Sequence, residues 1–229
     1  MLQLYIGNKN YSSWSMRPWV AMRQLGIAFD EVMVRFDSFA PDSQFKRTLR
    51  PLTPTGTVPV LVHDDLAIWD TLAIAEYLAE TFPQAGIWPA SVTDRARARA
   101  RSLCAEMHSG FTALRSHCPM NIEAQLPEVG AKIWAEQAAV RANVARLVDM
   151  WSELLQSHGG PMLFGRFSMV DAYFAPVCMR LHTYGLPVPP AIADYVQRVR
   201  AVPAVQAWIT QAEAEHDFRD FDEPYRTQR

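Results

Sequence analysis

The sequence has little excess charge of either sign, few cysteines and no long hydrophobic run. Its 22 Lys and Arg residues nearly balance its 24 Asp and Glu residues, which gives a formal net charge of −2. A nucleic-acid-binding protein usually carries a strongly basic face, so this balance argues against one. No apolar run approaches the roughly 18–20 residues that a membrane span needs, and the N-terminus lacks the basic and apolar regions of a secretion signal. We therefore expect no nucleic-acid or membrane partner.

Cysteine is the next scarce feature, and its spacing limits the possible chemistry. Cys104, Cys118 and Cys178 are odd in number and far apart, which argues against a disulfide framework and favours reduced thiols in the cytoplasm. The sequence contains no Cys-x-x-Cys and no His-Glu-x-x-His, so it suggests neither a dithiol redox site nor a zinc site. It also lacks the Gly-x-Ser-x-Gly segment of a hydrolase nucleophile elbow.

The first eighty residues alternate strand-like and helix-like segments. Leu2 to Ile6 alternates with the period of a strand. Met16 to Leu25 reads as a helix, with Pro18 in its first turn and Gly26 after its end. The other expected elements are strands at Phe29 to Val34, Val58 to Val62 and Leu66 to Ile68, a short helix within Pro41 to Leu49, and a helix at Thr71 to Glu80. The predicted order is β-α-β, a connector, then β-β-α.

Beyond a segment rich in proline and glycine, Phe82 to Ala90, the hydrophobic period becomes helical. Ser91 to Asp94 resembles a capping box at the start of a long helix that ends before Pro119. We expect a second long helix from near Pro127 to near Gly159, and three more that begin at Ser168, near Pro190 and near Pro203. We expect the polar tail, His216 to Arg229, to pack loosely.

Four motifs follow one another along the chain: Tyr11 to Arg17, Thr57 to Leu61, Trp69 to Ile74 and Phe167 to Asp171. In this order they resemble motifs of the glutathione transferase family. The first is similar to the active-site loop of the serine-type zeta class, the second to the Val-Pro-x-Leu segment, the third to the Glu/Gln-Ser-x-Ala-Ile motif and the fourth to the buried helix-capping motif. The resemblance implies an α/β thioredoxin-like domain at residues 1–82, a linker at 83–90 and an all-helical bundle at 91–229. It also implies glutathione as co-substrate, a small hydrophobic electrophile and a homodimer.

The active-site loop contains the expected catalytic residues. A serine hydroxyl that donates a hydrogen bond to the glutathione sulfur, beside a helix N-terminus, favours the reactive thiolate. By the zeta pattern Ser12 is the first choice and Ser13 the second, while Ser15 is better explained as the helix N-cap. Trp14 stands where the zeta pattern has cysteine, and we expect it among the glutathione-binding residues. The alternative is that Ser12, Ser13 and Ser15 are ordinary loop and cap serines.

Two further segments are expected to hold the tripeptide. The resemblance implies a cis bond before Pro59, which would let the Val58 backbone pair with the cysteinyl part of glutathione as an added strand does. Thr71, at a helix terminus, can bind the γ-glutamyl carboxylate, and Asp70 can accept from the γ-glutamyl amine. The alternatives are that Pro59 is an edge-strand proline with no ligand role, and that Asp70 and Thr71 only cap the helix.

Met107 and Phe111 lie four residues apart on the first long helix and could line the electrophile pocket, although such a pair is more often core. Ser168 and Asp171 are interpreted as a structural cap and not as a catalytic pair. The favoured function is a detoxifying glutathione S-transferase. The alternatives are a glutathione-dependent isomerase of the maleylacetoacetate type, against which Trp14 argues, and a non-catalytic interaction module.

Overall fold

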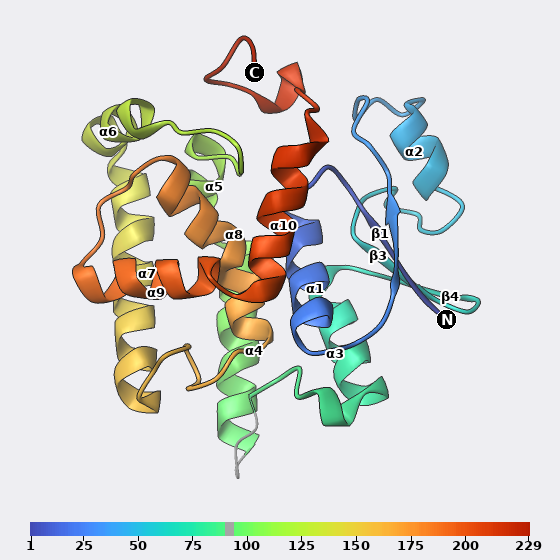
Figure 1. Cartoon of the computed structure of the whole chain (residues 1–229), viewed down its shortest axis with the longest axis horizontal. Helices are drawn as coiled ribbons and strands as arrows, with labels where there is room; N and C mark the ends of the chain where they lie inside the picture. Colours follow the sequence, from blue (N-terminus) through green and yellow to red (C-terminus); the bar gives the residue numbers. More distant parts are fainter. Residues whose placement is uncertain (90–93) are drawn as a thin grey trace.

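The computed structural model of the protein describes residues 1–89 and 94–229. The predicted capping box at 91–94 depends on residues outside these ranges. The first half forms a mixed sheet with helices around it, and the second half is helical (Figure 1). The division into a domain at residues 1–82, a linker at 83–90 and a second domain at 91–229 stays a prediction.

The sheet half follows the order predicted from the sequence. Its elements are β1 (Leu2–Ile6), α1 (Ser13–Gln24), β2 (Asp30–Met33), α2 (Gln44–Leu49), β3 (Val60–His63), β4 (Leu66–Trp69) and α3 (Thr71–Thr81). The strand order is β2-β1-β3-β4. Strand β1 is parallel to β2 and antiparallel to β3, which in turn is antiparallel to β4. This thioredoxin-like arrangement confirms the predicted fold class.

Alternation along β1 separates two hydrophobic clusters. Leu2, Leu4 and Ile6 are buried in the large core shared with the helices. Tyr5 faces the other way and packs against a small cluster beneath α2, which includes Phe36. Because side chains alternate across a strand, one short segment serves both faces of the sheet.

The helical half contains 3₁₀-helix η1 (Pro83–Ala85) and then α4 (Asp94–Ser109), α5 (Thr112–His117), α6 (Pro127–Glu136), α7 (Ala138–His158), α8 (Met169–Thr183), α9 (Pro190–Arg200), α10 (Pro203–Glu215) and the 3₁₀-helix η2 (Asp220–Asp222). Helix α8 is central, because it packs against α1, α4 and α9. All of its residues except His182 are buried. It therefore joins the sheet half to the helices.

The start of α8 confirms the predicted structural cap. The Ser168 hydroxyl accepts from the Val170 amide at 3.3 Å, and the Asp171 carboxylate accepts from the Ser168 amide at 3.0 Å. The Tyr195 hydroxyl also donates to Asp171 at 3.0 Å. Burial raises the pKa of Asp171 to about 6 although these donors act in the opposite direction. This carboxylate accepts hydrogen bonds from buried backbone amides, so its role is structural.

Two helices predicted as continuous are each divided, so both predictions were wrong. The helix expected to reach Pro119 breaks at Phe111, which is buried and has a left-handed backbone with φ 55°. The helix expected from Pro127 to Gly159 breaks at Gln137, with φ −105° and ψ 88°. Hydrophobic residues continue through both breaks at helical spacing, so periodicity alone does not reveal them.

Helix α1 begins three residues earlier than predicted, and Pro18 therefore lies inside it instead of in its first turn. A proline ring removes the hydrogen bond to the carbonyl four residues earlier, which here belongs to Trp14 in the first turn. The helix tolerates this loss because it is otherwise packed on both sides, by α8 and by α3 and α10.

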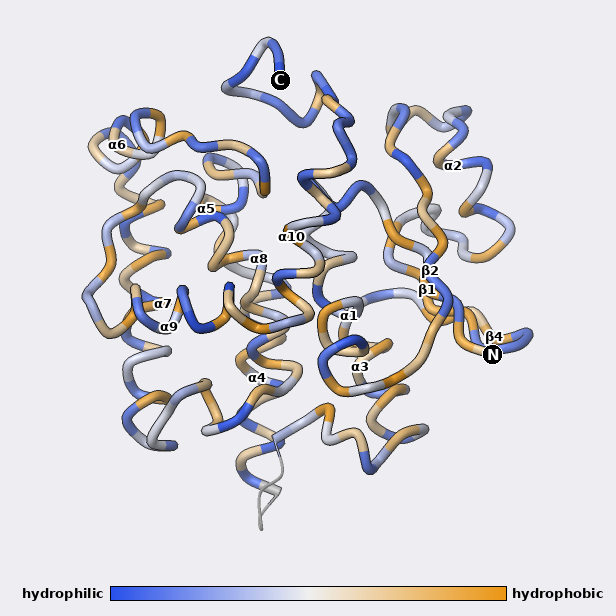
Figure 2. The backbone as a smooth tube through the Cα atoms, in the orientation of Figure 1, coloured by the Kyte–Doolittle hydropathy of each residue, from blue (hydrophilic) through white to orange (hydrophobic). Residues whose placement is uncertain are grey.

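The C-terminal segment does not pack loosely, contrary to the prediction. It is mostly hydrophilic (Figure 2), yet Glu223 is only 6% exposed. Its carboxylate accepts from the Tyr11 hydroxyl at 2.7 Å and from the Asn121 amide at 2.9 Å, and it pairs with Arg226. The tail is therefore fastened to the loop after β1, because a buried carboxylate needs partners.

Candidate functional site

The loop between β1 and α1 is held rigidly. The Asn8 carbonyl accepts from the amides of Tyr11 and Ser12, at 3.1 and 2.8 Å. The Asn8 side-chain oxygen accepts from the Phe36 amide at 2.8 Å. Gly7 lies so close to the Phe36 ring that an added Cβ would be 2.3 Å from it. These contacts fix the position of the following serines at the start of α1.

The three serines of the loop have different surroundings. The Ser12 hydroxyl is buried and donates to the Ser15 hydroxyl at 2.7 Å, and Ser15 also accepts from the Gly7 amide at 3.2 Å. Ser15 is thus a buried residue inside α1, and the prediction that it is the N-cap was wrong; Ser12 occupies that position without a capping hydrogen bond from its side chain. The Ser15 oxygen instead joins α1 to the end of β1.

Ser13 is the first residue of α1 and lines two pockets. Within the described residues its hydroxyl has no hydrogen-bond partner, in contrast to that of Ser12. The first amides of a helix also lack intrahelical acceptors and carry partial positive charge. Ser13 therefore offers a hydroxyl next to a helix N-terminus, which suits a negatively charged ligand atom.

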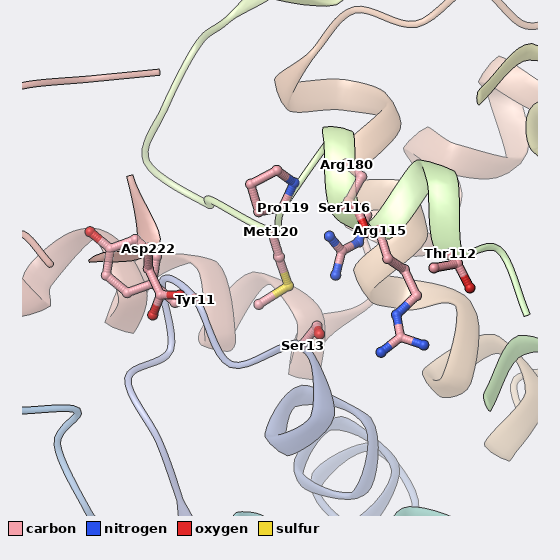
Figure 3. A pocket seen from close by; sticks show the side chains of 9 residues that line it. All are labelled: Tyr11, Ser13, Thr112, Arg115, Ser116, Pro119, Met120, Arg180 and Asp222. Carbon is pink, nitrogen blue, oxygen red and sulfur yellow. The ribbon is translucent and has the colours of Figure 1, made fainter. Parts of the chain in front are cut away.

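Three pockets surround this loop. The cis-proline pocket, of ≈ 260 Å³, is lined by Trp14, Thr55, Thr57, Val58, Pro59, Trp69, Asp70, Thr71 and His108. The loop pocket, of ≈ 240 Å³, is lined by Ser12, Ser13, Trp14, Val58, Lys46 and aromatic residues around α2. The arginine pocket, of ≈ 300 Å³, contains Ser13, Arg115, Arg180, Met120 and Asp222 (Figure 3). Shared lining residues make these pockets neighbours.

The cis-proline pocket brings together all five predicted glutathione-binding residues, from motifs far apart in the sequence: Trp14, Val58, Pro59, Asp70 and Thr71. The bond between Val58 and Pro59 is cis, as the resemblance implied. The pocket confirms that the residues are close together. Their roles toward a ligand stay predictions.

Asp70 and Thr71 belong to a polar network that reaches α8. The Asp70 carboxylate accepts from the Leu72 amide at 2.8 Å as the N-cap of α3, with φ 76°, which is uncommon for a residue other than glycine. Such strained backbone often occurs at ligand-binding sites. The Thr71 hydroxyl lies 2.6 Å from the Tyr173 hydroxyl. Capping and ligand binding can therefore coexist here.

His108 completes this network from α4. Its Nδ1 lies 3.0 Å from the Tyr173 hydroxyl and its Nε2 lies 3.3 Å from the Asp70 carboxylate. The imidazole ring also packs edge-on against Trp14, with 4.9 Å between ring centroids. His108 thus connects both walls of the cis-proline pocket.

Two arginine side chains lie close to the ring of Trp14. The guanidinium carbon of Arg17 lies 4.0 Å from the centre of the Trp14 ring, and that of Arg115 lies 4.8 Å from it. Arg17 is also 4.3 Å from the Tyr173 ring and only 1% exposed, and burial lowers its pKa to about 10. Each cation–π contact contributes about 0.5–2 kcal/mol, which partly offsets the burial of Arg17.

Met107 and Phe111 are 1% and 6% exposed and belong to the main hydrophobic core. This burial agrees with the alternative of core packing. Their role as substrate-binding residues stays a prediction.

Sequence reasoning missed His108, Tyr173, Arg115, Arg180 and Asp222. They lie on α4, α8, α5 and the tail, outside the motifs, and only the packing of these elements around α1 brings them to the pockets. A histidine or arginine in a helical pattern carries no local signal for this role.

Two absences concern only the part of the chain that the structure describes. No cluster of three or more His, Cys, Asp or Glu side chains there is arranged to hold a metal ion. None of the helices in that part is both long and apolar enough to cross a membrane.

Comparisons with known proteins agree with this fold. The family model "Glutathione S-transferase, N-terminal domain" matches residues 11–81, and "Glutathione S-transferase, C-terminal domain" matches residues 134–211. Together the two models match more than half of the chain. The chain belongs to the glutathione S-transferase family.

Individual relatives carry different names. Glutathione S-transferase 1 of Dianthus caryophyllus is 29% identical over 76% of this chain and 75% of its own. Maleylacetoacetate isomerase of Rattus norvegicus is 28% identical over 76% of this chain and 74% of its own. Other relatives are named stringent starvation protein A homologs. A glutathione transferase homolog from Burkholderia, solved with bound glutathione, is 28% identical, with a TM-score of 0.68 and coverage of 93% of this chain and 98% of its own.

Proposed function

We propose that the protein is a glutathione transferase that joins the glutathione thiolate to an electrophilic carbon. The observation that carries the proposal is the hydroxyl of Ser13, which has no hydrogen-bond partner among the described residues and lies at the N-terminus of α1, where Ser13 lines both the loop pocket and the arginine pocket. A homodimer and a cytoplasmic location remain predictions.

Glutathione is proposed to occupy the cis-proline pocket. The Thr71 hydroxyl and the first amides of α3 would bind the γ-glutamyl carboxylate, and Asp70 would accept from the γ-glutamyl amine. The Val58 backbone would pair with the cysteinyl unit. This placement directs the thiol toward Ser13, on the shared side of the loop pocket. The Burkholderia homolog with bound glutathione supports the same choice of ligand.

Activation of the thiol requires that the protein favour its ionised form. A free thiol has a pKa near ~8.5, and lowering it by about two units corresponds to roughly 2.7 kcal/mol. A hydrogen bond from Ser13 to a charged acceptor contributes about 1.5–3 kcal/mol, and the helix N-terminus adds about 0.3–1 kcal/mol. The two contributions together amount to about 1.8–4 kcal/mol, a range that includes the required value. The released proton passes to solvent.

The thiolate then attacks the electrophile. A sulfur–carbon bond forms, and a leaving group such as halide departs with the electrons of its bond to carbon. The protein's own thiols do not take this role, because Cys104 and Cys178 are fully buried and burial raises the pKa of Cys118 to about 12. The attacking thiolate is therefore supplied by a bound molecule.

The test has two parts. Calorimetry should detect glutathione binding, and an activated aryl halide should give a thioether in the presence of enzyme and glutathione. The absence of both would favour a non-catalytic interaction module. The similarity to the rat isomerase supports a second candidate; turnover of maleyl compounds, without turnover of aryl halides, would establish isomerisation instead.

A further inference from the structure

The arginine pocket differs from an apolar binding site for electrophiles. Two of its lining residues are arginines, Arg115 and Arg180, and Ser13 lies at its boundary with the loop pocket. Figure 3 shows both guanidinium groups on the Ser13 side of the pocket, with the Asp222 carboxyl at the opposite end. Any molecule that meets a thiol at Ser13 from this side must approach these cations.

Arg180 is buried without full use of its donors. The side chain is 5% exposed. Its Nη1 donates to the Cys118 carbonyl at 2.6 Å, which holds the guanidinium in place, but its Nε has no partner within the described residues. Leaving a buried charged donor unsatisfied costs at least the desolvation free energy of that group. An anion in the pocket would stabilise the buried positive charge of the guanidinium as a whole.

Arg115 and Arg17 add positive charge around the same point. Arg115 is half-buried and donates weakly to the His108 carbonyl at 3.3 Å. Arg17, behind Trp14, is fully buried, and its Nε and Nη1 also lack partners within residues 1–89 and 94–229. The pKa of Arg180 is lowered to about 10, first by burial and then by the like charges of Arg17 and Arg115. All three arginines therefore remain cationic near neutral pH.

Within the described residues no carboxylate forms a salt bridge with these three arginines. The ionisable groups with an opposing electrostatic effect on Arg180 are Tyr184 and Cys118, and burial keeps both neutral. Asp222 lines the pocket but pairs with neither arginine, and its pKa is raised to about 6 by burial and by the negative charge of Glu223. A buried group of cations that forms no salt bridge with a carboxylate of the described residues is typical of an anion site.

We propose that the arginine pocket binds the electrophilic co-substrate through a carboxylate, held by Arg180 and Arg115, with the reactive carbon directed toward Ser13. The inference rests on the proposed function, since it names the substrate class of that site. Arginine suits this role because its planar guanidinium can donate two parallel hydrogen bonds to a carboxylate. A pocket of ≈ 300 Å³ accommodates a small aromatic or unsaturated acid. The expected substrates are thus organic acids, in place of the uncharged hydrophobic molecules that the family resemblance implied.

Matched electrophiles test the proposal with the full-length protein. A chloronitrobenzoate and the corresponding benzamide share the ring and the leaving group and differ in charge. We expect kcat/KM to favour the benzoate, relative to the uncatalysed rates, by roughly tenfold to a hundredfold, the effect of one or two charge-assisted hydrogen bonds. Arg115→Gln should remove most of this preference. Arg99→Gln, on the surface and paired with Glu153, is the control for net charge.

A direct binding measurement separates this inference from the proposed function. Calorimetry with unreactive nitrobenzoate, without glutathione, should show binding that Arg115→Gln weakens at least fivefold and Arg99→Gln does not. Arg115 is half-buried, so this variant is expected to fold, which circular dichroism checks. Glutathione binding without any preference for nitrobenzoate over nitrobenzamide would overturn the inference alone. Nitrobenzoate binding without thioether formation would support the anion site and overturn the proposed function.

Discussion

Replacement of Ser13 by alanine tests which serine stabilises the thiolate. The Ser12 hydroxyl is already donated to Ser15 at 2.7 Å, whereas that of Ser13 is free among the described residues. Loss of a hydrogen bond to a charged acceptor costs about 1.5–3 kcal/mol. At 1.36 kcal/mol per pKa unit, Ser13→Ala should raise the pKa of bound glutathione by about one to two units. The helix N-terminus stays in place, so the pKa should remain slightly below that of free glutathione.

The assay is an ultraviolet titration of the thiolate band in the complex with glutathione. Ser12→Ala is the matched control: it should lower the free energy of unfolding by about 1 kcal/mol through the lost bond to Ser15 and leave the thiol pKa nearly unchanged. Ser13→Thr keeps a hydroxyl and should restore most of the effect. A rise of the thiol pKa in Ser12→Ala, with none in Ser13→Ala, would refute the reasoning and return Ser12 to the first place that the zeta pattern gave it.

Three other predictions follow from the packing. Asp222 has a pKa raised to about 6, and its ionisation places a negative charge in the arginine pocket. The affinity for nitrobenzoate, measured by calorimetry, should therefore fall as the pH rises through about 6. This fall should be absent in Asp222→Asn. Tyr173→Phe removes the hydroxyl that holds Thr71 at 2.6 Å; the Kd for glutathione should rise roughly tenfold, about 1.4 kcal/mol, and an unchanged Kd would contradict a positioning role. Gly130→Ala would place a Cβ 1.7 Å from the Tyr184 carbonyl oxygen. The free energy of unfolding, measured with denaturant, should fall by about 1–3 kcal/mol or more. The exposed control Lys132→Ala should change it little.

Local patterns in the sequence were sufficient for most of the sheet half. Alternation at Leu2 to Ile6 and the turn residues around it predicted β1, and the structure has the same bounds. The capping box at Ser168 and Asp171 also follows from residues three apart, because both partners belong to one helical turn. Such features depend on neighbours in the chain, so the sequence contains all the information they need.

The helix breaks show where local patterns stop being informative. Phe111 has φ 55°, and its buried side chain belongs to the main core. Tertiary burial outweighs the backbone cost of a left-handed residue, which is about 1–2 kcal/mol. No pattern within the helix could show that the core needed this aromatic ring there.

The candidate site divides in the same way. The motifs predicted the group of Trp14, Val58, Pro59, Asp70 and Thr71, and the pocket places them together. The choice between Ser12 and Ser13 remained open, because it depends on whether Ser15 accepts a hydrogen bond after the chain turns into α1. Hydrogen-bond satisfaction is a property of the folded environment.

By itself, the sequence determined the β-α-β and β-β-α order, the loop of serines before α1 and the cap of α8, because each depends on period, spacing or turn chemistry among near neighbours. Only the tertiary structure decided that Arg17, Arg115 and Arg180, from three different helices, lie near one another without a carboxylate partner among the described residues. The physical reason is that the electrostatic free energy of a charge depends on its distances to other charges and on its burial, and both are fixed when the helices pack.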